Sequence, residues 1–353
     1  MLFAEAVGID ITYDLFDTPP ESLGERVQEL IAAGYAGFNC TMPLKAEIFK
    51  YTHERSEQCR ILGVANTIKI APNGNLSAYT TDGDGMCAGI INSGAMLSQG
   101  TSTQGMSSQG MLSQGTLSQG TLSQGTLSQG TSSQGTSSQS TLSQSMLSQD
   151  MLSQSTLSQG TSSQGTSSQS TSSQSTLSQG TSHETLRGKS VLVLGAGGTS
   201  KAVILSLTEL GVRKVTVLNR GEAKLRETEA LFENHPQSGI LEFRVLSEEN
   251  LTEAVKCASV IINTSRLGMK GFEQAPDFDP HWNALAHVKA GTAAVDAVYN
   301  PIDTAFLQSA KSHGMTVTDG LWMLVYQAAL SFEIWTGIKL PLEIVAKAHR
   351  LCS

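Results

Sequence analysis

The chain has 353 residues, a formal net charge of −8 and 15% charged residues. Lysine and arginine never form a run, which argues against a nucleic-acid or membrane-surface partner because a phosphate backbone attracts a basic stripe. No apolar run is long enough to span a bilayer, and Met1 is not followed by a signal-peptide pattern, so we expect a soluble cytoplasmic protein. Five scattered cysteines without a C-x-x-C pair indicate neither a disulfide framework nor a metal site.

Residues 1–95 alternate predicted strands and helices, which favours a mostly parallel sheet covered by helices. The strand candidates are 11–17 (ITYDLFD) and 35–41 (YAGFNCT), the helix candidates are 20–34 and 44–52, and residues 65–82 form a predicted hairpin that turns at Asn73-Gly74.

Residues 96–180 are a tandem array of seventeen five-residue units such as MLSQG and TLSQG. Ser, Gln, Gly and Thr bury too little apolar surface to offset the entropy of ordering the chain, so the composition favours disorder. Ten units carry Leu at the second place, which leaves a leucine-stacked solenoid as the alternative. Either way the array, taken as 96–182, is an insertion between two folded segments.

The strand and helix pattern resumes at His183. Residues 189–211 form a predicted buried strand with four apolar residues (191–194), a glycine turn and a helix. Further predicted strands are 214–220, 258–269, which runs into a loop, and 293–301, and the other predicted helices are 222–235, 321–337 and 341–352. Pro341 suits the start of the last helix because its missing N–H is not needed there. We therefore expect an α/β protein with two folded domains and a low-complexity insertion.

A glycine-rich turn in VLVLGAGGTSKA separates a buried strand from a helix. Gly195, Gly197 and Gly198 allow a tight turn and let the backbone approach a pyrophosphate, which the helix N-terminus stabilises. Ser200 stands where the third glycine of the dinucleotide-binding pattern would be, and a turn without a ligand is the alternative. The expected cofactor contacts are Gly195, Ala196, Gly197, Gly198, Thr199 and Ser200.

The next strand ends in LNR, where NAD sites usually have an acid that binds the ribose 2′-hydroxyl. A guanidinium pairs with a 2′-phosphate instead, so Arg220, with Asn219 and Lys224 nearby, predicts NADP. An ordinary surface arginine is the alternative.

Two charged residues lie in loops of the first domain. Lys45 follows a proline turn, and Asp82 follows a strand and opens a glycine-rich helix start. Taken alone, Lys45 is a solvated side chain and Asp82 is a helix N-cap.

The chain resembles the shikimate dehydrogenase family over nearly its whole length except the array. The matching segments, in the family's order, are NCTMPLK, GVANTI, TTDGDG, LGAGGTSKA, LNR, INTSRLGM, DAVYNP and DGLWMLVYQAALSFEIWTG. The resemblance implies an N-terminal substrate domain (1–95), a Rossmann-like NADP domain (183–318) and C-terminal helices (319–353) that pack back on the first domain. It implies NADP-dependent interconversion of 3-dehydroshikimate and shikimate, a small-molecule reaction of aromatic amino acid biosynthesis.

The resemblance also implies residue roles. Lys45 would transfer the proton of the C3 hydroxyl and Asp82 would hold Lys45 in place, because hydride loss from a carbinol carbon needs a base for the O–H proton. Thr41, Asn66 and Gln327 fall on substrate hydroxyl contacts, and Tyr299 lies beside the ring. Gly320 and Met323 would line the nicotinamide.

The sequence departs from the family pattern in two places. A first strand with a Ser-x-Ser motif that binds the substrate carboxylate is absent, and Trp322 stands where many members have glycine. Two alternatives remain besides shikimate dehydrogenase: an enzyme acting on quinate or a related cyclic polyol, and a catalytically impaired relative that only binds ligand. The sequence gives no indication of oligomeric state.

Overall fold

The computed structural model describes residues 2–94, 186–271 and 279–353, which belong to one compact unit. The pentad array and its predicted structure therefore lie outside the described residues. Residues 2–94 contain α1 (Leu2–Ala6), η1 (Pro20–Ser22), α2 (Leu23–Ala32), β1 (Gly37–Asn39), η2 (Ile48–Tyr51), β2 (Glu54–Arg55), α3 (Glu57–Leu62), β3 (Thr67–Ile70), β4 (Leu76–Tyr79) and α4 (Asp82–Asn92).

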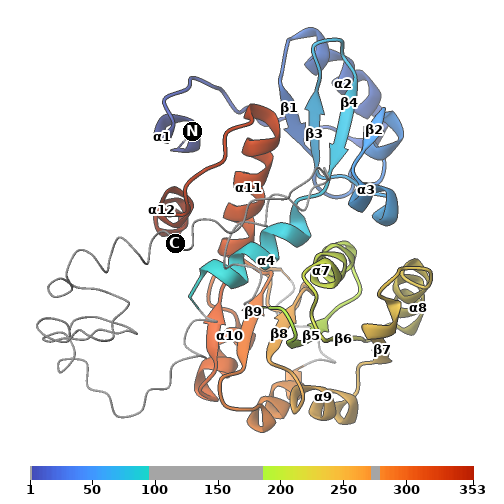
Figure 1. Cartoon of the computed structure of the whole chain (residues 1–353), viewed down its shortest axis with the longest axis vertical. Coiled ribbons are helices and arrows are strands. Elements are labelled where there is room, and N and C mark those ends of the chain that lie inside the picture. The colour runs from blue at the N-terminus through green and yellow to red at the C-terminus, as the bar shows by residue number, and fades with distance from the viewer. Residues whose placement is uncertain (1, 95–185, 272–278) are drawn as a thin grey trace, which may run out of the picture. The chain divides into compact units, whose positions relative to one another are not determined.

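The first sheet has four strands in the order β1-β3-β4-β2 (Figure 1). β3 pairs antiparallel with both β1 and β4, and only β2 and β4 are parallel. The expectation of a mostly parallel sheet was therefore wrong for this part of the chain. The predicted hairpin is its cause, because Gly74, at φ 85°, turns β3 directly into an antiparallel β4.

Two further expectations for this part of the chain were wrong. Residues 11–17 form no strand, and Leu15 is 88% exposed. Their alternating side chains have no sheet face to bury, and the segment is held to its neighbours by side chains, with Tyr13 Oη donating to Asn39 Oδ1 at 2.8 Å. Residues 44–52 form turns followed by the short 3-10 helix η2 rather than an α-helix.

The second sheet has six strands, all parallel, in the order β10-β9-β8-β5-β6-β7. Its elements are β5 (Ser190–Leu194), α7 (Gly198–Glu209), β6 (Lys214–Asn219), α8 (Glu222–Leu231), η6 (Ser238–Ile240), β7 (Leu241–Val245), α9 (Glu248–Val255), β8 (Val260–Asn263), η7 (Asp279–His287), β9 (Ala293–Asp296), α10 (Ala305–Ser312) and β10 (Thr316–Thr318). The strand order reverses between β5 and β8, which is where ligands bind in sheets of this kind. The predicted Rossmann-like topology is confirmed.

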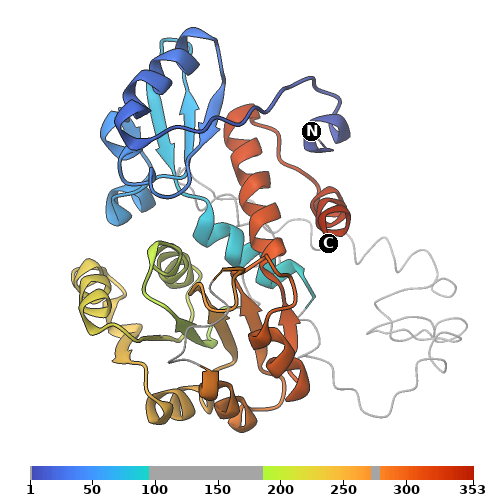
Figure 2. The ribbon, with the colours of Figure 1, turned by 180° about the vertical axis from the view of Figure 1, so that it is seen from behind.

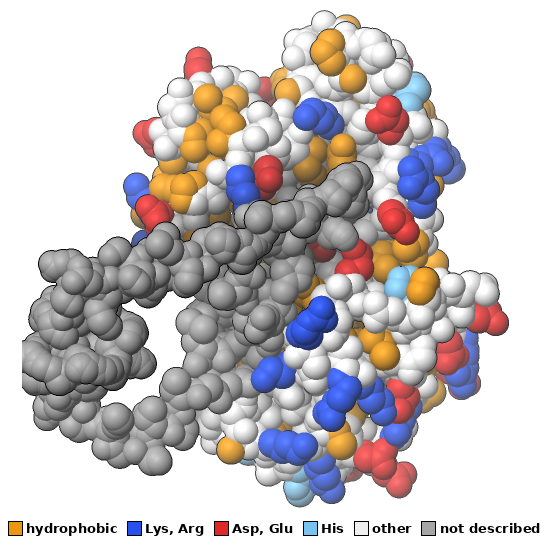
Figure 3. All heavy atoms as spheres, in the orientation of Figure 1, with side chains coloured by type: hydrophobic (Ala, Val, Ile, Leu, Met, Phe, Trp, Pro, Cys, Tyr) orange, Lys and Arg blue, Asp and Glu red, His pale blue; other side chains and the backbone are white. Residues whose placement is uncertain are grey.

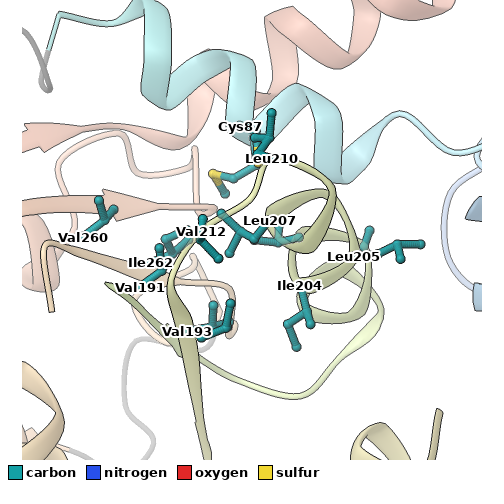
Figure 4. Packing of buried hydrophobic residues seen from close by; sticks show 14 of the residues in the cluster. Cys87, Val191, Val193, Ile204, Leu205, Leu207, Leu210, Val212, Val260 and Ile262 are labelled. Carbon is teal, nitrogen blue, oxygen red and sulfur yellow. The ribbon is translucent and has the colours of Figure 1, made fainter. Parts of the chain in front are cut away.

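Continuous apolar runs explain why β5 and β8 are central strands. Every residue of both strands is buried, as parallel strands covered on two faces require. Figure 4 shows Val191 and Val193 of β5 on the side of α7 where Leu207 lies, in one buried cluster. Cys87 of α4 belongs to the same buried cluster, so the core of the second sheet extends to the first part of the chain.

Two helices complete the chain, α11 (Gly320–Thr336) and α12 (Leu342–Cys352). Buried residues of α1, α11 and α12 form one hydrophobic cluster, which packs the C-terminal helices on the N-terminal one. Figures 1 and 2 show α11 running beside α4 in both views.

Glycines let α4 approach two other helices closely. A Cβ atom on Gly83 would lie 2.2 Å from the backbone oxygen of Ala202 in α7, and one on Gly85 would lie 2.9 Å from the backbone nitrogen of Gln327 in α11. Real Cβ atoms do not come so near to backbone atoms, so a side chain at either position would push the helices apart. α4 is thus fixed between α7 and α11.

Acidic, basic and hydrophobic side chains all occur on the face of the molecule in Figure 3. Among the described residues, no helix has the length and apolarity needed to cross a membrane.

Candidate active site

Lys45 and Asp82 form an ion pair. Lys45 Nζ donates to Asp82 Oδ2 at 2.5 Å, and the two side chains are 24% and 7% exposed. Lys45 lies in the turn before η2, whereas Asp82 is the first residue of α4. Thr81, not Asp82, occupies the N-cap position, so the N-cap alternative for Asp82 was wrong and its carboxylate is directed to the lysine instead.

Asn66 holds the second oxygen of the Asp82 carboxylate. Its Nδ2 donates to Asp82 Oδ1 at 2.7 Å and lies 3.1 Å from Gln327 Oε1. Its Oδ1 accepts the backbone N–H of Thr81 at 2.9 Å. Asn66 is 3% exposed, and a buried amide with partners on both ends keeps one orientation. The carboxylate is therefore fixed from two sides.

Three polar residues that sequence reasoning missed extend this network. Thr67 Oγ1 lies 2.8 Å from Ser331 Oγ, and Asn39 Nδ2 is 3.0 Å from both of those hydroxyls. They come from β3, α11 and β1, so the network joins the first sheet to α11. Asn39 and Thr67 lie inside the motifs NCT and ANT, and these motifs could have indicated that both belong to the site. Nothing in the sequence around Ser331, which lies in a long apolar helix, indicates this.

Of the other predicted substrate contacts, only Gln327 belongs to this network. It contacts Asn66, whereas Thr41 is exposed, four residues before Lys45. Tyr299 is 47% exposed in the loop after β9. Gly320 packs against the backbone of the same loop, since a Cβ atom there would lie 2.4 Å from the oxygen of Val298. The start of α11 and the loop carrying Tyr299 are thus in contact.

The predicted glycine turn joins β5 to α7. Gly195 adopts φ 117°, which side chains disfavour, and its N–H donates to Leu218 O of β6 at 2.8 Å. Cβ atoms built on Gly197 and Gly198 would meet nothing within 4 Å, so the space above the N-terminus of α7 is open. Open backbone at a helix N-terminus fits a pyrophosphate, which needs close approach to free N–H groups.

Ser200 stabilises this turn from inside. It is fully buried, its hydroxyl accepts the N–H of Gly197 at 2.9 Å and lies 2.7 Å from Thr264 Oγ1, and Thr264 donates to Leu194 O. The Ser200 side chain therefore supports the turn from inside rather than facing outward. Thr264 was missed because its role depends on β8 lying beside β5.

Asn219 and Arg220 lie next to the glycine turn, as predicted. β6 ends at Asn219, Leu218 pairs with Leu194 across the sheet, and Arg220 is exposed. Asn219 Nδ2 donates to Gly221 O at 2.9 Å, which shapes the start of α8, and Lys224 lies exposed in the first turn of that helix. The two parallel strands thus bring the predicted pyrophosphate and 2′-phosphate contacts to the same sheet edge.

Trp322 stacks on the C-terminal helix. Its ring centroid is 4.1 Å from that of His349, with an interplanar angle of 15°. His349 Nε2 lies 3.0 Å from Asp319 Oδ1, and that oxygen accepts the N–H of Leu321 to cap α11. Trp322 is thus accommodated by α12, next to the turn that carries Gly320 and Met323.

A buried carboxyl organises the end of β8 and β9. Asp296 accepts hydrogen bonds from Asn263 Nδ2 at 2.9 Å, Thr304 Oγ1 at 2.6 Å and the N–H of Val298 at 2.9 Å. Burial raises the pKa of Asp296 to about 6, against the opposing effect of these donors.

Among the described residues no group of His, Cys, Asp and Glu side chains has the arrangement of a metal site.

Comparisons with known proteins identify the family of this chain. Three family models match: the shikimate dehydrogenase substrate binding domain over residues 1–68, shikimate/quinate 5-dehydrogenase over residues 177–267, and the shikimate 5′-dehydrogenase C-terminal domain over residues 320–348. A shikimate dehydrogenase (NADP(+)) of Bacillus cereus (strain G9842) is 28% identical over 333 residues, covering 94% of this chain and 84% of the relative.

Solved structures share the fold. The shikimate 5-dehydrogenase of Listeria monocytogenes, in complex with shikimate and NAD, has a TM-score of 0.65 at 19% identity and covers 98% of this chain and 88% of that one. The shikimate 5-dehydrogenase of Thermus thermophilus, in complex with NADP(H) and shikimate, has a TM-score of 0.60 at 24% identity, covering 100% of this chain and 92% of that one.

Proposed function

Because the chain belongs to the shikimate dehydrogenase family, we propose that it catalyses the reversible, NADP-dependent reduction of 3-dehydroshikimate to shikimate. The observation that supports this most directly is the Lys45–Asp82 ion pair, held by Asn66 at the start of α4. In this proposal residues 1–95 and 319–353 bind the substrate, and residues 183–318 bind the cofactor.

Lys45 is the proton-transfer residue of the proposed reaction. In the oxidation direction its neutral amine takes the proton of the C3 hydroxyl, and in the reduction direction its ammonium returns a proton to the C3 oxygen. Asp82 orients Lys45 by accepting its hydrogen bond, and Asn66 keeps the carboxylate from rotating away. Correct position and orientation of a proton-transfer group lower the activation barrier by a large amount. The Asp82 carboxylate that orients Lys45 is therefore held from two sides.

The residues of the glycine turn fit an NADP cofactor, which when bound accepts or supplies the hydride. The open backbone at Gly197 and Gly198 suits the pyrophosphate, and Asn219, Arg220 and Lys224 suit the 2′-phosphate. Gly320 and Met323 lie on α11 next to the loop of Tyr299, where they would line the nicotinamide side of the site.

Neutral side chains select the substrate hydroxyls in this proposal. Thr41, Asn66 and Gln327 offer hydroxyl and amide groups, which hydrogen-bond a polyol without adding charge. Tyr299 would lie beside the ring, since the loop that carries it contacts the start of α11.

The test is whether the full chain oxidises NADPH in the presence of 3-dehydroshikimate. The reaction is monitored by the loss of NADPH absorbance, and the product is then identified as shikimate. 3-Dehydroquinate is offered in parallel. Turnover with 3-dehydroshikimate supports the proposal, and turnover with 3-dehydroquinate alone reassigns the substrate. No turnover with either, from protein that binds NADPH, would leave the chain as a ligand-binding relative.

A further inference from the structure

The first turn of α4 carries two carboxylates whose hydrogen bonds go to different elements. Asp82 pairs with Lys45, as described above. Asp84 Oδ1 accepts hydrogen bonds from Ser206 Oγ at 2.6 Å and from Gln58 Nε2 at 3.3 Å. Residues two apart in an α-helix differ in direction by about 200°. The two carboxylates therefore leave α4 on opposite sides, one to the catalytic lysine and one to α7.

The bonds of Asp84 are part of a buried polar cluster. Asp84, Gln58 and Ser206 are 7%, 5% and 2% exposed, and Gln58 Nε2 also donates to Glu209 Oε2 at 2.9 Å. Burial raises the pKa of the Asp84 carboxyl, and the donors from Ser206 and Gln58 act against this. A buried acceptor that loses its donor is strongly penalised, so these contacts hold α3, α4 and α7 in one arrangement.

Gly83, which lies between the two carboxylates, is in close contact with α7. The backbone oxygen of Ala202 in α7 occupies the place where its side chain would be, and the Cβ position would also lie 2.5 Å from Ser206 Oγ. α7 therefore touches α4 at the residue between Asp82 and Asp84. The other end of α7 is the glycine turn at Gly198, which in the proposed function faces the cofactor.

We propose that Asp84 and Ser206 are positioning residues that transmit the position of the cofactor-binding helix α7 to Asp82 and so couple nucleotide binding to the catalytic pair. This inference rests on the proposed function for the identity of the ligand at α7. A nucleotide at the N-terminus of α7 fixes that helix, the Ser206–Asp84 hydrogen bond fixes the first turn of α4 against it, and Asp82 is two residues away on the same turn.

Three variants separate this role from a merely structural one. Ser206→Ala leaves the buried Asp84 carboxylate without its hydroxyl donor, whereas Asp84→Asn keeps an oxygen that accepts from Ser206 and serves as the conservative rescue. Thr208→Val is the matched control, because Thr208 is a fully buried residue of the same helix whose hydroxyl donates to Leu205 O within α7. Ser206→Cys, which keeps the size but donates weakly, replaces Ser206→Ala if that variant does not fold.

The first measurement is the Kd of NADPH with and without saturating shikimate, together with kcat and KM. Ser206→Ala should lower the coupling between the two ligands at least about threefold and kcat about tenfold, with each KM rising by no more than the coupling falls. In Asp84→Asn and Thr208→Val, the coupling, kcat and both KM values should stay within about twofold of those of the unsubstituted chain. If Ser206→Ala and Thr208→Val behave alike, the inference is wrong.

A second measurement does not need turnover. Hydrogen exchange of the α4 amides is compared with and without NADPH alone. Protection of α4 on adding NADPH in the unchanged chain and in Thr208→Val, but not in Ser206→Ala, supports the coupling. Equal protection in all three contradicts it. A chain that shows this protection pattern yet reduces neither 3-dehydroshikimate nor 3-dehydroquinate would disprove the proposed function and leave the coupling in place.

Discussion

Asn66 and Gln327 meet at the Asp82 carboxylate, with Asn66 Nδ2 lying 3.1 Å from Gln327 Oε1 and 2.7 Å from Asp82 Oδ1. The two residues are 261 positions apart in the chain. Their contact joins the hairpin of the first sheet to α11, so the orientation of Asp82, and through it that of Lys45, depends on both ends of the chain.

Replacing Lys45 with methionine should remove the proton-transfer group while keeping most of the side-chain volume. We expect kcat to fall roughly 10²-fold or more, with little change in KM, because the loss affects the transition state. Steady-state kinetics in both directions measures this. Lys50→Met is the matched control, since Lys50 is an exposed lysine of η2 paired with Glu47, and its kinetics should not change. Equal losses in the two variants would contradict the role of Lys45.

Replacing Arg220 with aspartate should reverse the cofactor preference. The unchanged chain should bind NADP(H) at least tenfold more tightly than NAD(H), or about 1.4 kcal/mol, because the guanidinium pairs with the 2′-phosphate. Arg220→Asp puts a carboxylate there, which repels the phosphate and accepts from a 2′-hydroxyl. Calorimetric Kd values for both nucleotides measure the ratio. Arg226→Asp, the same charge change at an exposed arginine of α8, should leave the ratio unchanged.

Most of the second sheet was predictable from the sequence, and so were β1 and the β3–β4 hairpin of the first sheet, whereas the mostly antiparallel direction of the first sheet was not. The buried apolar strands and the glycine turn at Gly195 are local signals, and a parallel sheet follows from strands that alternate with helices. Residues 11–17 show why alternation alone is insufficient: a strand also needs a neighbour to pair with and a face to bury, which only the assembled sheet decides. The same limit applied to residues 44–52, whose apolar side chains fit a turn and η2 as well as a helix.

The site was predictable only where a motif carried it. Lys45 and Asp82 were each ambiguous alone, and the resemblance joined them before any distance was known. Thr67, Ser331 and Thr264 were missed because a hydroxyl in the sequence gives no indication of its partner. Asp84 was not singled out either, since its hydrogen bond to Ser206 depends on α7 lying against α4.

Gly83→Ala should destabilise the protein. The new methyl group would lie 2.2 Å from the backbone oxygen of Ala202, which cannot move without displacing α7. We expect the free energy of unfolding to fall by roughly 1–3 kcal/mol or more, as measured by denaturant titration. Gly239→Ala is the control, because its Cβ atom would meet nothing within 4 Å and should change stability by less than about 0.5 kcal/mol. A Gly83→Ala chain as stable as the control would refute the close approach.

Asp296 should make stability depend on pH. Its pKa is raised from 3.8 to about 6 in the folded protein, so between these values the folded state binds more protons than the unfolded state. Stability from this group is therefore present at low pH and lost as pH rises through about 6, by on the order of 2–3 kcal/mol. The free energy of unfolding relative to Asp296→Asn should fall between about pH 4 and about pH 7, and a flat difference would contradict the assignment. The asparagine is tolerated because the Thr304 hydroxyl can reverse its direction and accept.

The stack of Trp322 on His349 gives the protein an intrinsic fluorescence probe of the contact between α11 and α12. The chain has three tryptophans, and Trp335 is the second one at a contact between parts of the chain, where its indole N–H donates to Ile68 O of β3 at 2.9 Å. Undocking of α12 would expose the Trp322 indole to water and shift its emission, while separation of α11 from the first sheet would do so for Trp335. Variants that keep Trp322 or Trp335 as the single tryptophan would let fluorescence follow each contact separately, without a dye or an added tag.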